Sequence, residues 1–294
     1  MIETLESLAL PRLACYNFGM YLGVDVGGTK TLVAVLNDDG VIREQLKFPT
    51  PENYDNWRLE LRHALANFTH HDFHAAGVGI AGRIDRHTGR HFAAGHLGWD
   101  DVPIQADIER IAHCPVTLDN DAKLAALSEA LILKDRYRRV LYVTISTGVG
   151  YSLVVDQHID ENIGDSGGNT IMVEYHGRHV SWESVASGRA IVKHYGKKAM
   201  DIHDEAAWHA ISRLIAKGLR ELIAITEPEV VVFGGSVGVY FDRFHKPLAT
   251  ELKKYELPIL VQPKLVRAQR PEEAVVYGCY DLANQRFGHA VAAA

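Results

Sequence analysis

A glycine-rich stretch near the start of the sequence, DVGGTK, has residue types that can bind a phosphate group. Backbone N–H groups at a turn of small residues form an anion-binding concavity, and glycines let the backbone approach a phosphate closely. Two apolar, strand-like runs flank Gly27, Gly28, Thr29 and Lys30. Asp25 lies near the end of the first run, where its carboxylate could hold Mg²⁺ through a water molecule. The alternative is a plain hairpin turn whose glycines have positive φ.

Two later stretches share this design. STGVG contains Thr147, Gly148 and Gly150 between apolar runs, and VVVFGGSVG contains Gly234 and Gly235 after another run. Ordinary turn chemistry is the alternative for each stretch alone. Together, the three stretches predict a nucleotide site in which two turns face the phosphates and the third approaches the α-phosphate and adenosine.

The segment LDNDAKLAALSEAL supplies a candidate general base. Asp121 lies where a strand-like segment meets a strongly helical one. Phosphoryl transfer to an alcohol needs a carboxylate that accepts the hydroxyl proton and aims the oxygen at phosphorus. The alternative is that Asn120 or Asp121 only caps the helix.

Two other readings of the glycines are excluded by their context. GVGIAG, residues 77–82, has the glycine spacing of a dinucleotide site, but its glycines lie within a strand-like run and no helical pattern follows. DVGGTK nearly matches a P-loop, but Thr29 separates the last glycine from Lys30 and a strand follows.

The elements that must position these residues alternate between strands and helices, which predicts an α/β fold. The hairpin expected at residues 140–156 repeats the design of the hairpin at residues 21–36, which points to two related halves. Helices are predicted at residues 53–71, from about Trp182, at residues 205–226 and at residues 271–287.

Composition narrows the function classes. The chain has 294 residues, a net charge of −6 and three isolated cysteines. This charge disfavours non-specific binding to nucleic acid or to anionic membranes, and isolated cysteines indicate neither a disulfide framework nor a cysteine zinc site. No apolar run reaches the roughly 18 residues that span a bilayer. We therefore expect a cytoplasmic protein with no nucleic-acid or membrane partner.

The order DVGGTK, DNDA, STGVG, WESVASG and PEVVVFGGS resembles the ROK family of sugar kinases and sugar-responsive repressors. The resemblance covers nearly the whole chain from Met20. It implies an actin-like ATPase (ribonuclease H-like) fold, with two related α/β domains around a cleft. We expect a small domain at residues 20–125, a larger one at residues 126–272, and a closing helix at about residues 273–288 that packs back on the first domain.

The resemblance implies ATP and Mg²⁺ as cofactors and Asp121 as the catalytic base. The positions expected to hold the nucleotide are those of the three turns, together with Asp25 for the metal: Gly27, Gly28, Thr29, Lys30, Thr147, Gly148, Gly150, Gly234 and Gly235.

For the sugar, the resemblance implies contacts from Asn120 and Glu183. It also implies a sugar-side loop built from AGRID and HLGWDDVP, in which we place Gly82 and His96; His96 stands where asparagine is usual. The expected substrate is a glucose-like hexose or an N-acetylhexosamine, and the expected assembly is a homodimer.

The region GDSGGNTIMVEYHGRHVSWE departs from the family pattern. It contains no cysteine, so we expect the zinc site of many members to be missing, and Asn169 replaces a sugar-binding glutamate. Glu174, His176 and His179 are a weak metal set, with exposed loop histidines as the alternative. The altered loop leaves open which sugar is bound, and it favours a rival function as a catalytically weak sugar-binding or regulatory protein.

Repressors of the family carry a DNA-binding helix-turn-helix before the first phosphate turn. Only 19 residues precede Met20 here, so we expect no such module. Residues 1–19 are expected to be a dispensable extension.

Overall fold

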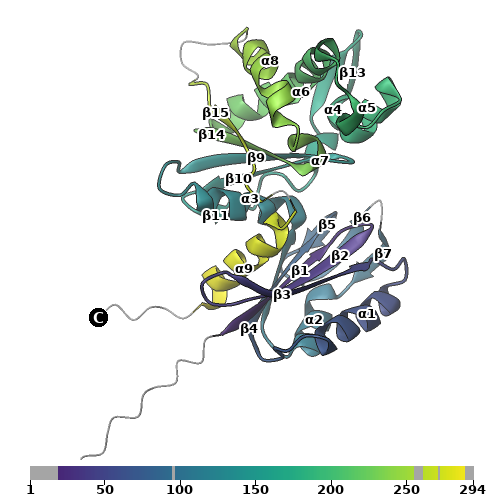
Figure 1. Ribbon diagram of the computed structural model, residues 1–294, viewed down its shortest axis with the longest axis vertical. Coiled ribbons are helices and arrows are strands. Elements are labelled where there is room, and N and C mark those ends of the chain that lie inside the picture. The colour runs from purple at the N-terminus through teal and green to yellow at the C-terminus, as the bar shows by residue number, and fades with distance from the viewer. Residues whose placement is uncertain (1–18, 95–96, 255–260, 271, 289–294) are drawn as a thin grey trace, which may run out of the picture.

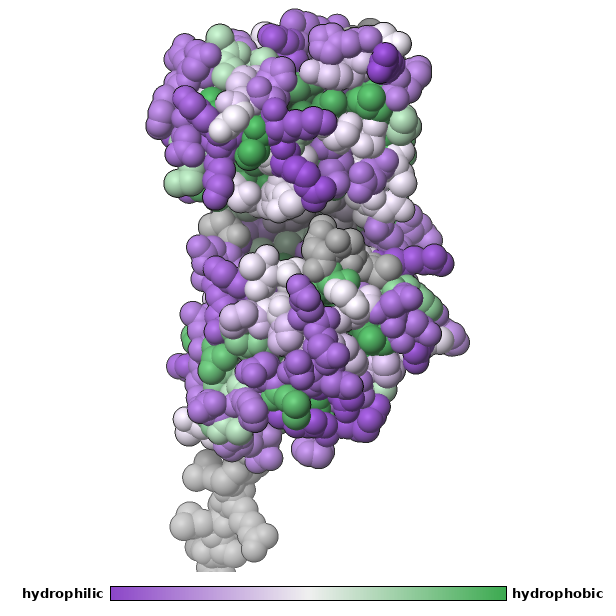
Figure 2. Space-filling model, turned by 90° about the vertical axis from the view of Figure 1, so that its right-hand side faces the viewer, coloured by the Kyte–Doolittle hydropathy of each residue, from purple (hydrophilic) through white to green (hydrophobic). Residues whose placement is uncertain are grey.

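The computed structural model describes residues 19–94, 97–254, 261–270 and 272–288. These residues form two lobes, each built around a five-stranded sheet (Figure 1). The lobes are stacked along the long axis, and the space-filling view shows an indentation between them (Figure 2). The predicted α/β architecture with two related domains is confirmed.

The first sheet has the strand order β3-β2-β1-β4-β8. Its strands are β1 (Met20–Val26), β2 (Lys30–Leu36), β3 (Ile42–Pro49), β4 (Phe73–Ile80) and β8 (Val116–Asn120). Strands β1, β4 and β8 are parallel, while β2 and β3 extend the sheet as antiparallel neighbours. Consecutive side chains of β1 point to opposite faces of the sheet, and both faces are covered. Leu22 packs with α1 (Tyr54–Ala66) and α2 (Ile104–Ala112), and Tyr21 packs with α9 (Ala274–Phe287).

The second sheet repeats this plan with the order β11-β10-β9-β14-β15. Its strands are β9 (Arg139–Ile145), β10 (Val149–Val155), β11 (His158–Ile159), β14 (Val230–Gly234) and β15 (Lys264–Arg267). One face packs on α3 (Asp121–Ile132), and the other packs on α6 (Glu205–Thr226) and α8 (Phe241–Lys253). The shared strand order supports the duplication predicted from the two hairpins.

Helices α3 and α9 cross between the two sheets. The crossing is close because Gly278 of α9 faces the backbone of Leu124, where a Cβ atom would overlap the chain. Gly77 of β4 likewise faces the backbone of Cys279. The glycines of GVGIAG therefore let α9 lie directly on the sheet, as expected for glycines inside a strand. The domain boundary expected at residue 125 falls inside α3.

Smaller elements surround the sheets. They are a three-stranded sheet of β5 (Arg83–Asp85), β6 (Arg90–Ala94) and β7 (Leu97–Val102), a hairpin of β12 (Met172–Tyr175) and β13 (Arg178–Ser181), and the short helices η1 (Gly167–Asn169), η2 (Ala199–Asp201) and α7 (Gly235–Gly238). In the described part of the chain, no helix is long and apolar enough to cross a bilayer.

The single helix predicted from about Trp182 is wrong, because the structure has two helices there. These are α4 (Glu183–Ala186) and α5 (Gly188–Tyr195). Ser187 has an extended backbone (φ −74°, ψ 162°), and its side chain accepts a hydrogen bond from the N–H of Ala190. It therefore ends one helix and caps the next.

Candidate functional site

The carboxyl ends of the parallel strands β1, β4 and β8 meet at one edge of the first sheet. Asp25 lies opposite Gly79, and Gly79 lies opposite Asp119. Asn120 ends β8, and Asp121 begins α3 immediately afterwards. In open parallel sheets, this edge is where ligands bind.

Asp25 and Asp121 interact electrostatically at this edge. The pKa of Asp25 is raised to about 7, mainly by burial and then by the negative charge of Asp121, while Lys47 on β3 lowers it. Two carboxylates held near each other favour either a proton or a bound cation. From the sequence, Asp25 was expected to hold Mg²⁺ and Asp121 to act as the base. The structure places both side chains at the same edge of the sheet.

The first glycine turn joins the antiparallel strands β1 and β2 as a hairpin, but without the positive φ angles expected of a plain hairpin turn. Neither Gly27 nor Gly28 has a positive φ. The turn is held by the hydrogen bond from the N–H of Gly27 to the carbonyl of Lys30 (3.0 Å). Thr50 braces it from outside, because its hydroxyl donates to the Gly27 carbonyl (2.8 Å) and its N–H donates to the Thr29 carbonyl (3.0 Å). Backbone angles do not require glycines here, but a Cβ atom on Gly27 would lie only 3.0 Å from the carbonyl oxygen of Lys30. That this turn binds a phosphate stays a prediction.

The second and third glycine turns meet at Ser146. The Ser146 hydroxyl accepts a hydrogen bond from the N–H of Ser236 (3.0 Å), and its carbonyl accepts one from the N–H of Gly188 (2.7 Å). Gly235 has φ +80°, and a Cβ atom there would lie 2.6 Å from the carbonyl oxygen of Ile145. Only glycine fits this contact between the two turns.

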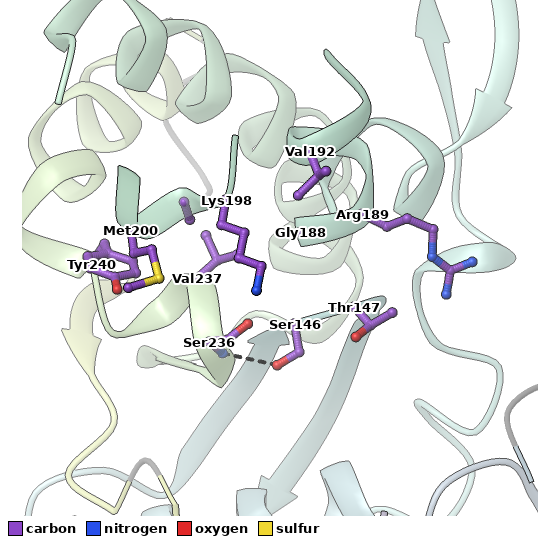
Figure 3. Close-up of a pocket in the computed structure, with 11 residues that line it drawn as sticks. Ser146, Thr147, Gly188, Arg189, Val192, Lys198, Met200, Ser236, Val237 and Tyr240 are labelled. Atoms are coloured by element: carbon purple, nitrogen blue, oxygen red, sulfur yellow. Dashed lines mark hydrogen bonds between the residues drawn. The ribbon is translucent and has the colours of Figure 1, made fainter. Parts of the chain in front are cut away.

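A cavity of about 490 Å³ opens beside these two turns (Figure 3). Ser146, Thr147 and Ser236 line it along the strand ends, and Lys198 points toward them. The opposite wall is apolar and partly open to solvent, and it is formed by Val192, Met200, Val237 and Tyr240.

Met200 is 54% exposed and Val192 is 43% exposed, which is high for apolar side chains that line a hollow. No local motif in the sequence marks four of these lining residues, because only the fold brings η2 beside α5 and α7: Val192, Lys198, Met200 and Tyr240.

Asn120 and Asp121 both contact the start of α3. Asn120 is the N-cap, and its Oδ1 accepts a hydrogen bond from the N–H of Ala122 (2.9 Å). Asp121 Oδ1 accepts from the same N–H (2.8 Å). Asn120 also reaches the sugar-side loop, where its Nδ2 donates to the carbonyl of Gly82 (3.4 Å). Capping is therefore present, and it fixes the orientation of both side chains at the strand edge.

Glu183 and Asn169 line one hollow of about 250 Å³ in the second lobe. Glu183 also contacts the second phosphate turn, because its Oε2 accepts a hydrogen bond from the N–H of Val149 (2.9 Å). A Cβ atom on Gly148 would lie 2.5 Å from that oxygen. Glu183 thus supports the turn between β9 and β10, and its expected contact with a sugar stays a prediction. His96 lies outside the described residues.

The side chains weighed as a metal set are exposed on the β12–β13 hairpin, in agreement with the alternative of loop histidines: Glu174, His176 and His179. Within the ranges that the structure describes, no three His, Cys, Asp or Glu side chains form a metal-binding group. Whether zinc binds stays a prediction.

Comparison with known proteins identifies the family. The sequence pattern of the ROK family matches residues 21–286. The chain belongs to the ROK family. It has the actin-like ATPase fold of that family.

Among curated relatives, a putative fructokinase of Bacillus subtilis is 28% identical over 73% of this chain and 76% of its own length. An N-acetylmannosamine kinase of Escherichia coli is 29% identical over 81% of this chain and 91% of its own length. The structure of a ROK family glucokinase from Streptomyces griseus, in complex with glucose and AMPPNP, superposes with a TM-score of 0.75 at 22% identity. That match covers 91% of this chain and all of the other. These relatives are sugar kinases, and they differ in the sugar that they are named for.

Proposed function

We propose that the protein transfers the γ-phosphate of ATP to a hydroxyl of a hexose, either glucose-like or an N-acetylhexosamine. The observation that carries this proposal is the position of Asp121. It lies at the sheet edge beside Asp25, and Gly150 of the second phosphate turn packs close to the neighbouring Ala122. A carboxylate beside a phosphate site, next to an asparagine that contacts the sugar-side loop, is suited to activating an alcohol.

Asp121 acts as the general base. Its carboxylate accepts the proton of the attacking sugar hydroxyl and aims that oxygen at phosphorus. The hydrogen bond from the N–H of Ala122 holds the carboxylate in one orientation, so little reorganisation is needed when the sugar binds. Asn120 and Gly82 form the adjoining wall of the sugar site.

The donor set fits a magnesium nucleotide. Mg²⁺ is usually held by one or two carboxylates together with substrate phosphates, and Asp25 supplies a carboxylate at this edge while Asp121 stays available as the base. Asp25 would hold the metal through water. Bound Mg²⁺ would neutralise charge on the phosphates.

The cavity beside the second and third turns fits the nucleoside. The apolar wall of the cavity would cover the adenine ring of the nucleotide. The hydroxyls of Ser146 and Thr147 lie where the phosphate chain would leave the cavity. Lys30 and Thr29, exposed at the first turn, would face the phosphates from the other lobe. We propose that both lobes must approach the nucleotide, which excludes water from the transfer.

A coupled ADP-release assay across hexoses, N-acetylhexosamines and pentoses tests this function. We expect sugar-dependent ADP release for at least one hexose or N-acetylhexosamine, and we expect Asp121→Asn to abolish it. ADP release that is equal with and without every sugar would contradict the proposal.

The engagement of Glu183 with the second turn favours one other function, a sugar-binding regulatory protein. Its carboxylate already accepts a backbone N–H, and Asn169 beside it carries no charge, so sugar contacts on this side are weakened for catalysis. Calorimetric binding of a sugar that causes no ADP release would identify this alternative.

A further inference from the structure

Four charged side chains form a network that joins the two lobes. Arg86 lies in the turn after β5 of the first lobe, and its guanidinium contacts Asp119 at the end of β8 and Asp165 in the second lobe. Lys123 also reaches Asp165, with Nζ 3.1 Å from Oδ1, which is the oxygen that accepts from Arg86 Nη2. None of these four side chains has a role in the proton transfer or the nucleotide binding proposed above.

On the first lobe, the network ends directly beside the proposed base. Arg86 Nε and Nη2 donate to Asp119 Oδ1 at 3.2 and 2.7 Å. The same oxygen accepts the backbone N–H of Asn120 (2.7 Å), and Asp121 follows in the chain. Asp119 is buried, with 1% of its side chain exposed, so its charge depends on Arg86 for a partner.

On the second lobe, the network holds the segment of residues 164–169. Gly164 and Gly167 lie against the backbone of β10, with φ of +106° and +56°, so the segment belongs to this lobe by packing. Arg86 Nη1 and Nη2 donate to the two carboxylate oxygens of Asp165 at 2.9 and 2.8 Å. This is a forked pair, which fixes direction as well as distance. Asn169 ends the same segment.

We propose that Arg86 is a positioning residue that fastens the segment of residues 164–169 to the end of β8. The sugar is then enclosed between Asn120 and Asp121 on one side and Asn169 on the other. The sugar part of this inference rests on the proposed function, whereas the fastening itself does not.

Two features support a role in positioning beyond simple neutralisation of Asp119. The Arg86 fork could bind Asp119 alone, yet it also binds Asp165, which is 45% exposed and could be hydrated by water instead. Burial would raise the pKa of Asp165, but the hydrogen bond from Arg86 and the charge of Lys123 outweigh it and lower that pKa. Asp165 therefore carries its negative charge at neutral pH, facing the guanidinium of Arg86.

Asp165→Asn is the sharpest test, because it weakens the link between the lobes and leaves the buried Asp119 paired with Arg86. It also removes the carboxylate beside the buried Lys123, which keeps its hydrogen bonds to the carbonyls of Asp160 and Glu161. Arg86→Gln leaves the Lys123 contact in place and so separates the two effects.

The matched control for Asp165→Asn is Asp156→Asn. Asp156 is 52% exposed and also takes a fork from an arginine, Arg138, but this pair lies within the second lobe. Amide hydrogen exchange of residues 164–169 is measured in the sugar-free protein, and steady-state kinetics are measured with a sugar that the wild type phosphorylates.

For Asp165→Asn, we expect exchange in residues 164–169 to be about tenfold faster and the sugar KM to rise about tenfold, because a hydrogen bond between charged groups contributes at least that much. The KM for ATP should stay within about twofold. Asp156→Asn should change none of these values. Equal changes of both KM values, or exchange no faster than in the control, would overturn the proposal.

Arg86→Gln is the second variant, with Arg138→Gln as its control. It should reproduce the faster exchange, because glutamine cannot supply the fork to both carboxylates. A folded Arg86→Gln protein with wild-type exchange in residues 164–169 would contradict the fastening. If the wild type transfers phosphate to no sugar, the proposed function fails, while the exchange measurements still decide whether Arg86 fastens the segment.

Discussion

The two lobes share one strand order but carry different chemistry at equivalent positions. Asp25 is the next-to-last residue of β1 and pairs with Gly79 of the parallel strand β4. Thr144 is the next-to-last residue of β9 and pairs with Gly234 of the parallel strand β14. The equivalent position in the two sheets thus holds a carboxylate in one lobe and a hydroxyl in the other.

This difference indicates that the two lobes, after duplication, took different roles in the proposed reaction. The edge of the first lobe gathers carboxylates, which suit proton transfer and a metal ion. The edge of the second lobe gathers hydroxyls, glycines and an apolar wall, which suit a nucleotide. Neither lobe holds a complete site, so the proposed reaction needs both.

The largest expected effect comes from removing the base of the first lobe. Asp121→Asn should lower kcat by at least ~10²-fold, because asparagine cannot accept the hydroxyl proton. Binding of ATP should be nearly unchanged, since the nucleoside cavity belongs to the second lobe. Steady-state kinetics and ATP titration measure the two effects. Near wild-type turnover would show that Asp121 only caps the helix. The control is Asp135→Asn, because Asp135 is exposed and lies beyond the other end of α3.

Asp25→Asn separates the function of the first lobe from its stability. Activity should fall because the proposed Mg²⁺ site loses its carboxylate. The raised pKa of Asp25, about 7, means that the folded state binds a proton more tightly than the unfolded state does. The stability contributed by that proton is complete below about pH 4 and is lost as pH rises through about 7.

The variant should therefore increase the free energy of unfolding by about 3–4 kcal/mol at pH 8 without Mg²⁺, and the gain should shrink toward pH 5. Denaturant titrations at both pH values measure this difference. The exposed Asp72→Asn should show no such dependence. A variant that is less stable at pH 8 would show that Asp25 is not held beside a like charge.

A smaller effect is expected in the second lobe. Ser146→Ala removes the hydroxyl that accepts the N–H of Ser236 and so loosens the joint between the second and third turns. The KM for ATP should rise about two- to tenfold, because a neutral hydrogen bond contributes about 0.5–1.5 kcal/mol. The sugar KM should stay within about twofold. A change confined to the sugar KM would contradict the assignment of nucleotide binding to the second lobe.

The smallest effect concerns sugar choice. Asn169→Glu restores a charge beside Glu183 in their shared hollow. Hydrogen bonds to charged groups contribute about 1.5–3 kcal/mol against about 0.5–1.5 for neutral ones. The ratio of kcat/KM between two sugars should therefore shift, with the KM for ATP unchanged. An unchanged ratio would show that other residues of the segment 164–169 face the sugar.

The sequence predicted those features whose signal is local. The glycine turns lie between apolar runs, so both hairpins and the repeated plan were visible in the residue pattern. The place of Asp121 at a strand–helix junction was predicted because such a junction is also a local signal, and its role as the base stays a prediction.

The missed features depend on contacts across the chain. Thr50 braces the first turn only because β3 returns beside β2, and Arg86 meets Asp165 only when the two lobes stack. The helical residue pattern did not reveal the break at Ser187, because the extended backbone there depends on a contact with a distant part of the chain. The N–H of the next residue, Gly188, donates a hydrogen bond to the carbonyl of Ser146.

Phosphorus-31 NMR of the protein with ATP, Mg²⁺ and the sugar that gives the fastest ADP release tests the central claim most directly. We predict a phosphomonoester resonance of the sugar that grows in equal amount with ADP and does not appear with Asp121→Asn. Growth of inorganic phosphate in place of the sugar phosphate, at the same rate with and without sugar, would contradict the assignment of Asp121 and of the cleft to sugar phosphorylation.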